Sequence, residues 1–265
     1  MFKGFNLMDV VGFGSATATL AAHGKAVCSE GSTSVRQSLE AFVNGAAIDG
    51  TRLQKHWFPK VEAHVFISHS HSDASLAFAL AGWLDKVFGL KSFIDSAVWG
   101  YSDKLLKAID RVNCWSKERQ CYIYEKRNLS TSHVHMMLAT ALGHMIDSTE
   151  CLLFLNTPQS ITSKGAMEKT NSSWLLAELT MATTMRCAKP KRWQMAQLQQ
   201  NFAAEDVMTK TASLKVEYEV DLTPFTTLTA DTLNKWSDER TGGHPLDDLY
   251  RVAGVAGVES PTVYG

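Results

Sequence analysis

The chain has 265 residues, a mass of 29.2 kDa and a formal net charge of −1, with 45% hydrophobic and 20% charged residues. These are ordinary globular values, and the length is enough to bury a full core. A pI near 6.7 lacks the basic excess typical of proteins that bind nucleic acid or anionic membranes, so we expect neither partner. The five cysteines form no Cys-x-x-Cys pair, and no segment is long and apolar enough to span a bilayer, which predicts a reduced, cytoplasmic protein.

Residues 1–62 predict an N-terminal extension with one helix. Gly12 and Gly14 follow a short apolar stretch, as in a dinucleotide-binding turn, but Thr17 stands where the third glycine belongs. A flexible or strand-like leader is therefore the better interpretation of the first part. A capping box followed by an apolar stripe at helical spacing predicts the single helix over residues 34–48.

From residue 63 onwards the sequence alternates apolar runs with helical patterns. Three runs predict buried strands: Val65–Ile67, Ser92–Ile94 and Cys151–Leu155. The helix after the first run should begin near Ser72 or Asp73 and end before Gly89. This alternation predicts an α/β fold, with a flavodoxin-like parallel sheet flanked by helices.

Two segments lie outside this alternation. Residues 111–149 predict an inserted helical segment, capped at Ser130 or Ser132, that serves as a lid or an assembly surface. Its histidines and cysteines lack the convergent spacing of metal ligands, and we expect no metal site. Residues 191–265 form a C-terminal extension that we expect to complete or flank the sheet, because the alternating pattern at Lys215–Leu222 predicts a half-exposed edge strand.

The helix that begins after Ser172 or Ser173 carries an acid with no local partner. Glu178 lies one turn after Trp174 on the same face, and no Lys or Arg stands three or four residues away from it. Burying an unpaired acid is costly, so Glu178 must meet a distant base, water or a ligand. A glutamate that reaches solvent or a remote arginine is the simpler alternative, and the pattern leaves both open.

Polar residues follow each of the three predicted strands. In an open parallel sheet, ligands bind beyond the carboxyl ends of the strands, and the helix with Glu178 begins at the same edge. We therefore expect one cleft that Glu178 shares with the residues at the strand ends. These residues are Ser68, His69, Asp95, Ser96, Asn156 and Thr157.

Two of these strand ends resemble motifs of Toll/interleukin-1 receptor (TIR) domains. Val65–His69, followed by Asp73, resembles the first box of the family. Phe93–Asp95, followed by Trp99 and Gly100, is similar to the second strand of the family and the glycine-bearing loop after it.

A third motif extends the resemblance. Ser172–Leu179 is similar to the Ser-x-Trp-Cys-x-x-Glu-Leu pattern of the enzymatic and plant members, with Leu175 in place of the usual cysteine. The three motifs occur in the order of the family and define a TIR-like domain over residues 63–190, interrupted by the insertion. The whole chain resembles a stand-alone bacterial TIR protein of the antiphage-defence kind.

The resemblance implies an enzyme that cleaves the nicotinamide–ribose bond of NAD+ and then hydrolyses, cyclises or transfers the ADP-ribose part. NAD+ would be the substrate, and no prosthetic group is implied. Glu178 would be the catalytic residue, either stabilising positive charge on the ribose or holding its hydroxyl groups. The implied substrate-binding residues are Ser68, His69, Asp95, Trp99, Gly100 and Trp174. Each of them also has a purely structural interpretation, such as a core position for Trp174.

The resemblance also implies partners. A homo-oligomer formed through TIR contacts is expected, and a separate effector protein would read the nucleotide product. The alternative is a non-catalytic TIR module that signals by self-association. Scaffolding does not need the pair of Trp174 and Glu178, so this pair favours the enzyme.

Overall fold

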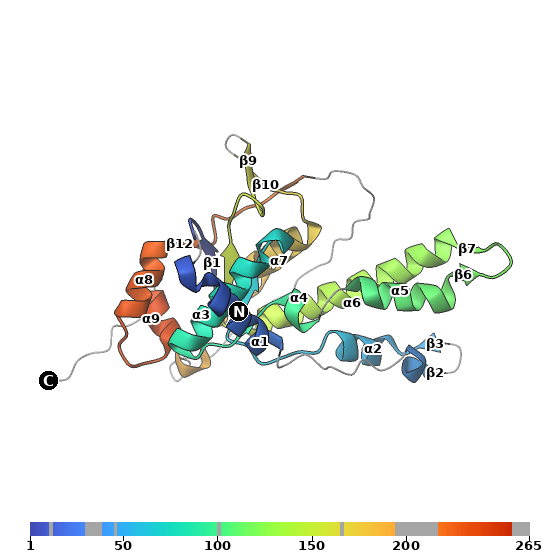
Figure 1. The fold of residues 1–265 in the computed structure, drawn as a ribbon, viewed down its shortest axis with the longest axis horizontal. Coiled ribbons are helices and arrows are strands. Elements are labelled where there is room, and N and C mark those ends of the chain that lie inside the picture. Colours follow the sequence, from blue (N-terminus) through green and yellow to red (C-terminus); the bar gives the residue numbers. More distant parts are fainter. Residues whose placement is uncertain are drawn as a thin grey trace.

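The computed structural model describes residues 1–10, 13–29, 39–44, 47–99, 102–164, 167–193 and 217–255. Five strands form the central sheet: β1 (Lys3–Leu7), β4 (Val65–Ser68), β5 (Ser92–Phe93), β8 (Cys151–Leu155) and β12 (Thr226–Leu228). They are all parallel and lie in the order β12-β1-β8-β4-β5. With helices on both faces of this sheet (Figure 1), the predicted flavodoxin-like α/β fold is confirmed.

The N-terminal strand lies inside the sheet, which differs from the predicted extension. β1 pairs with β8 on one side and with β12 on the other. Counted from β4, the strands β5, β4 and β8 follow the 2-1-3 order of flavodoxin-like sheets. In flavodoxin-like sheets the fourth position holds a strand that comes later in the chain, but here the N-terminal strand β1 holds it. β12 holds the fifth position. Phe5 and Leu7 hold β1 there, because both are fully buried against one face.

The rest of the N-terminal segment also differs from the prediction of one helix over residues 34–48. The described elements are α1 (Thr17–Ser29), the 3-10 turn η2 (Leu39–Phe42), β2 (Val43–Asn44), β3 (Ala47–Ile48) and α2 (Gly50–Trp57). β2 and β3 pair in antiparallel orientation within the region expected to be helical. Residues 34–38, 45 and 46 of this region lie outside the described residues.

The remaining helices complete the two layers. They are α3 (Ala74–Phe88), α4 (Asp95–Val98), α5 (Ser102–Asn113), α6 (Tyr124–Ser148), α7 (Ser173–Thr184), α8 (Ala230–Asp238) and α9 (Pro245–Val252). α3 ends as predicted, because Gly89 adopts a φ of 67° and its amide donates to carbonyls of the last turn. None of the helices in the described part of the chain is long and apolar enough to cross a membrane.

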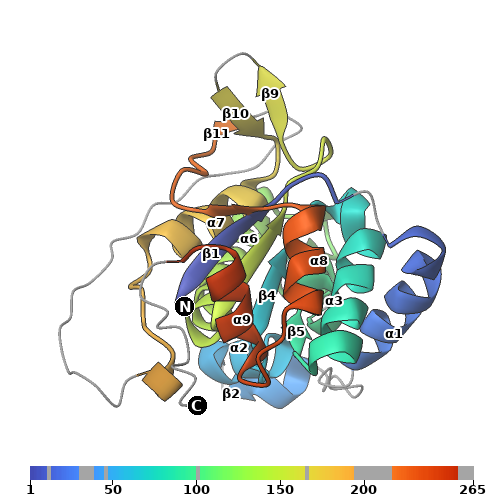
Figure 2. The ribbon, with the colours of Figure 1, turned by 90° about the vertical axis from the view of Figure 1, so that its left-hand side faces the viewer.

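The sheet separates two apolar cores. Because side chains alternate along a strand, Leu152 and Phe154 of β8 face the core formed with α2, α5, α6 and α7. Leu153 and Leu155 face the other core, formed with α1, α3, α8 and α9. Figure 2 shows α1 and α3 on one side of β4, with α6 and α7 on the other side. A residue on the sheet can therefore be assigned to a face from its register alone.

The inserted segment forms a projecting arm. α5 and α6 run antiparallel away from the sheet, and the hairpin of β6 (Trp115–Ser116) and β7 (Cys121–Tyr122) joins them at the far end (Figure 1). α6 is continuous through the predicted caps Ser130 and Ser132. Ser130 instead donates its hydroxyl to Asp110 of α5, which is buried and also accepts from Arg127 at 3.0 Å. These contacts fasten the two helices together near the hairpin.

A second, antiparallel sheet lies above the carboxyl edge of the first. It consists of β9 (Thr162–Lys164), β10 (Met167–Thr170) and β11 (Tyr218–Glu219), in the order β11-β10-β9. β11 is an edge strand of this small sheet and covers two residues of the alternating pattern at residues 215–222. The first two residues of that pattern lie outside the described part of the chain.

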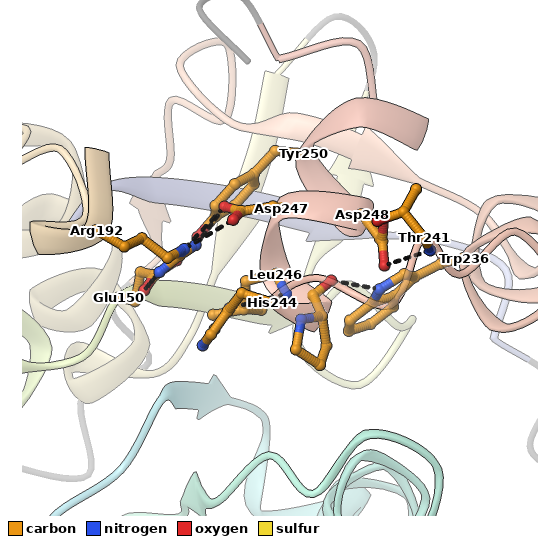
Figure 3. A network of polar contacts seen from close by, with 10 residues as sticks. Glu150, Arg192, Trp236, Thr241, His244, Leu246, Asp247, Asp248 and Tyr250 are labelled. Carbon is orange, nitrogen blue, oxygen red and sulfur yellow. Dashed lines mark hydrogen bonds and ion pairs between the residues drawn. The ribbon is translucent and has the colours of Figure 1, made fainter. Parts of the chain in front are cut away.

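A network of charged residues fastens the C-terminal helices to the opposite, amino edge of the main sheet (Figure 3). Arg192, in the 3-10 turn η4 (Lys191–Trp193), donates to the two carboxylate oxygens of Glu150 at 2.6 and 2.7 Å. Its Nε donates to Asp247 of α9 at 2.8 and 3.0 Å. Tyr250 of α9 donates its hydroxyl to Glu150 at 2.8 Å. Glu150 directly precedes β8, the central strand of the sheet. The network therefore holds α9 and η4 against the amino end of β8.

Replacing Arg192 by alanine is expected to lower the free energy of unfolding by about 3 kcal/mol, because two mostly buried carboxylates then face each other without a cation. The side chains of Glu150 and Asp247 are 18% and 28% exposed, so water screens this loss only in part. Urea unfolding measures the change. Lys191→Ala, an exposed neighbour, is the matched control and should stay within about 0.5 kcal/mol of the parent protein. Equal unfolding midpoints for the two variants would contradict a stabilising role of the network.

Candidate active site

The structure brings Ser68 and Glu178 together, although they lie 110 positions apart in the chain. Ser68 is the last residue of β4, and its side chain points to the face of the sheet that α7 covers. Its hydroxyl donates to Oε2 of Glu178 at 2.6 Å. The two residues are 1% and 5% exposed. Glu178 is therefore a buried acid whose partner is a strand-end hydroxyl, rather than an acid that reaches solvent or a remote arginine.

The environment of Glu178 favours its neutral form. Burial raises the pKa of the Glu178 carboxyl well above its usual value, and the negative charge of Asp95 raises it further. The hydrogen bond from Ser68 acts in the opposite direction and lowers the pKa. A carboxyl group that stays protonated in a buried site can donate a proton or gain charge when a ligand changes its surroundings.

Asp95 and His69 lie at the neighbouring strand ends. Asp95 begins α4 one residue beyond the end of β5, and the amide of Ser96 donates to its Oδ1 at 2.6 Å. Burial lowers the pKa of His69, while the charges of Asp95 and Asp73 partly restore it. Burial thus favours the neutral imidazole, the form that can accept a proton.

Asp73 and Thr157 join the segments that follow β4 and β8. Asp73 stands at the N-cap of α3, as predicted, but its carboxylate makes no capping bond. It accepts instead from the Thr157 hydroxyl at 2.6 Å, so the start of α3 is joined to the end of β8. The helix after β8 covers one face of the sheet and the helix after β4 covers the other. Such a switch point between neighbouring parallel strands is where open α/β sheets bind ligands.

A cavity of about 230 Å³ lies beside Thr157 on the face of α3. It lies at the carboxyl ends of β1 and β8 and does not include Glu178. Its lining residues are Leu7, Asp9, Val10, Leu76, Leu155, Asn156, Thr157 and Pro158. Asp9 has a φ of 57°, a left-handed conformation that is uncommon outside glycine. Thr157 therefore contacts the cavity on one side and the bonded Asp73 on the other.

Asn6 is a site candidate that sequence reasoning missed. It stands on β1 in one row with Phe154 of β8 and Ser68 of β4, on the same face of the sheet as Glu178. The row places the Cα atoms of Asn6 and Ser68 about 10 Å apart, two strand spacings. Asn6 is 6% exposed, and its Oδ1 is buried with no hydrogen-bond partner among the described residues. A buried hydrogen-bond acceptor without a donor is costly and rare. A ligand that donates a hydrogen bond to Oδ1 would therefore suit this position.

Trp174 lies one turn before Glu178 and is half-buried. The N-cap of its helix is Ser172, whose hydroxyl accepts from the amide of Leu175 at 3.2 Å. The indole of Trp174 meets His135 of the arm edge to face, with ring centres 5.5 Å apart. Next to this contact, a groove of about 450 Å³ separates α6 from α7 and is lined by three methionines. Trp174 thus joins the site to the arm.

The structure does not bring the other predicted aromatic residue to the site. Trp99 is 1% exposed and packs in the core against Phe58 and Phe93. Its indole N–H donates to the carbonyl of Pro59 at 2.9 Å. Gly100 lies outside the described residues.

A scan against protein-family models found no match, and neither did searches of curated proteins and of solved structures. The class of this protein therefore follows from its fold and its site. It is a flavodoxin-like α/β protein with a buried, serine-bound carboxyl group at the switch point of its parallel sheet.

Proposed function

We propose that this protein cleaves the nicotinamide–ribose bond of NAD+, the reaction of the enzymatic TIR domains that its three motifs resemble. The observation that carries the proposal is the buried pair of Ser68 and Glu178 at the carboxyl edge of the sheet. Asp95 and His69 stand beside this pair, which supports a site with several groups able to hold or move protons.

The charge of the substrate suits the environment of Glu178. The nicotinamide ring of NAD+ is cationic, and a cation that enters a buried site lowers the pKa of a neighbouring carboxyl group. Glu178 would thus lose its proton when the substrate binds. Its negative charge would then lie where the reaction needs it, in surroundings that exclude water.

The bond between the ribose C1′ and the nicotinamide nitrogen breaks with its electron pair going to nicotinamide, which leaves as a neutral molecule. The ribose is left with positive charge, as in glycoside cleavage. The carboxylate of Glu178 would stabilise that charge more than it stabilises the bound substrate. Asp95 or His69 would accept the proton from the water or hydroxyl group that attacks C1′. The carboxamide of Asn6 would accept a hydrogen bond from a hydroxyl or amide group of the substrate.

The test is direct. Purified full-length protein is incubated with NAD+, and nicotinamide is followed by chromatography over a wide range of protein concentrations. Release of nicotinamide in excess of the protein, with loss of NAD+, is the expected result. If the protein binds NAD+ in calorimetry but releases no nicotinamide at any concentration, the binding site is supported and the reaction is refuted. A protein that neither binds nor cleaves NAD+ would refute both.

The proposal includes a setting and partners. A stand-alone enzyme of this kind would act in the cytoplasm in bacterial antiphage immunity, assemble as a homo-oligomer and pass its nucleotide product to a separate effector. A TIR-like module that signals only by self-association is the second candidate. The nicotinamide assay separates the two, because a scaffold has no turnover.

A further inference from the structure

Large apolar side chains that face solvent are concentrated on the arm, and all of them except Met136 lie at its far end. Among the described residues, all those with exposures of 40% or more lie between Val112 and Met136. They are Val112, Trp115, Tyr122, Tyr124, Leu129 and Met136. Single exposed apolar residues are normal, but a concentration in one projecting element marks an interaction site.

The same end of the arm has a local excess of positive charge, although one of its cations, Arg127, is paired with Asp110. Residues 111–129 carry five cationic and two acidic side chains, whereas the whole chain has a net charge of −1. The cations are Arg111, Lys117, Arg119, Lys126 and Arg127, the acids are Glu118 and Glu125, and all seven are exposed. The charge of the whole chain predicts no affinity for anionic surfaces, but it conceals this local excess.

We propose that the tip of the arm, residues 111–129, docks on a lipid bilayer that contains anionic headgroups. Lysine and arginine are attracted to such a surface, and the rings of Trp115 and the two tyrosines favour the level of the headgroups. Val112 and Leu129 supply aliphatic surface that can enter the boundary of the acyl chains.

The shape of the tip favours a fluid surface over a folded partner. Tyr124 and Leu129 are five positions apart on α6, so their side chains point about 140° away from each other around the helix. A rigid protein would need a deep socket to cover side chains that point in several directions. A bilayer interface surrounds them without such a socket. α6 has 25 residues and is about 37 Å long, so its tip reaches a plane well away from the sheet.

Contacts within the tip disfavour nucleic acid and a second tip as occupants. Trp115 and Tyr122 pack edge to face with ring centres 4.9 Å apart. The guanidinium of Arg127 lies 5.5 Å from the centre of the Tyr122 ring. These contacts use ring surface on which bases would stack, and aliphatic side chains add nothing to base stacking. Two tips of equal positive charge repel each other.

Co-sedimentation of the full-length protein with vesicles tests the proposal. Vesicles of phosphatidylcholine and phosphatidylglycerol in equal parts should bind the protein, and pure phosphatidylcholine should not. High salt should release it. The double variant Lys117→Glu/Arg119→Glu should lower the partition coefficient at least about tenfold, because it replaces two attracted charges by two repelled ones. Lys25→Glu/Lys235→Glu makes the same change of charge on α1 and α8 and should leave binding unchanged.

A second readout locates the contact. Brominated lipids in the anionic vesicles should quench the tryptophan fluorescence of the parent protein, and Trp115→Phe should remove most of this quenching. Circular dichroism melting confirms that the exposed substitutions leave the fold intact. Equal vesicle binding by the tip and control variants would overturn the proposal. So would tip-dependent binding of an RNA or DNA oligonucleotide, or tip-dependent dimerisation in light scattering, in a protein that does not sediment with vesicles.

Discussion

Replacing Glu178 by glutamine is expected to lower the rate of NAD+ cleavage at least about 100-fold, the usual scale for removing one preorganised electrostatic group. The amide keeps the shape of the side chain, and its oxygen can still accept from the Ser68 hydroxyl. What disappears is the negative charge that would face the ribose in the transition state. Nicotinamide release under saturating NAD+ measures the effect.

The same substitution should leave the folded protein at least as stable at neutral pH. Burial and the charge of Asp95 raise the pKa of Glu178 in the folded state, so the folded protein binds more protons than the unfolded chain at pH values above the usual carboxyl pKa. Stability then falls as pH rises from that value through the raised folded pKa. Glutamine has no proton to lose, so the difference in melting temperature between Glu178→Gln and the parent should grow over this interval.

Loss of rate together with unchanged or greater stability distinguishes a functional acid from a structural one. Glu62→Gln removes an exposed carboxylate and is the matched control, with neither rate nor stability changed. Asp95→Asn should weaken the pH dependence, because it removes one cause of the raised pKa of Glu178. A Glu178→Gln protein that turns over NAD+ at the parent rate would refute the catalytic assignment. A marked drop in its melting temperature would identify Glu178 as a structural anchor.

Local sequence chemistry predicts much of the sheet and part of the site. Continuous apolar runs predict β4 and β8, and the glycine at position 89 predicts the end of α3, because the required positive φ suits it. The absence of a local partner for Glu178 indicates that its contact is distant or solvent, and it leaves the burial of the acid open. The polar strand end at Ser68 supplies that contact. Each of these inferences depends on residues within a few positions of one another, or on the general geometry of parallel sheets.

Other features depend on long-range packing and escape this reasoning. β1 is a five-residue strand, and its place between β8 and β12 depends on segments that follow it by more than 140 residues. Asn6 could not be assigned to the site before β1 was placed. Trp99 resembles a binding residue next to a loop glycine, yet contacts with Phe58 and Phe93 draw it into the core. Ser130 has the local chemistry of a helix cap, but the buried Asp110 gives it a better partner.

The contact between α1 and α3 should be the most sensitive to substitution in the fold. Gly24 and Gly82 let the two helices touch backbone to backbone. A Cβ at Gly82 would lie 2.1 Å from the carbonyl oxygen of Leu20, and one at Gly24 would lie 2.0 Å from that of Phe78. Backbone atoms of packed helices cannot move aside singly, so the helices would have to separate along their length.

We expect Gly82→Ala to lower the free energy of unfolding by about 3 kcal/mol or more, although alanine favours a helix over glycine by about 1 kcal/mol. The melting temperature should fall by about 6–12 °C. Gly143→Ala on α6 is the matched control, because its Cβ would meet nothing closer than the methyl group of Met185 at 3.5 Å. That variant should be unchanged or slightly more stable. Gly24→Ala should resemble Gly82→Ala, and the double variant should cost less than the sum, because one separation of the helices relieves both overlaps. Melting curves of Gly82→Ala and Gly143→Ala that shift equally would refute the close approach of α1 and α3.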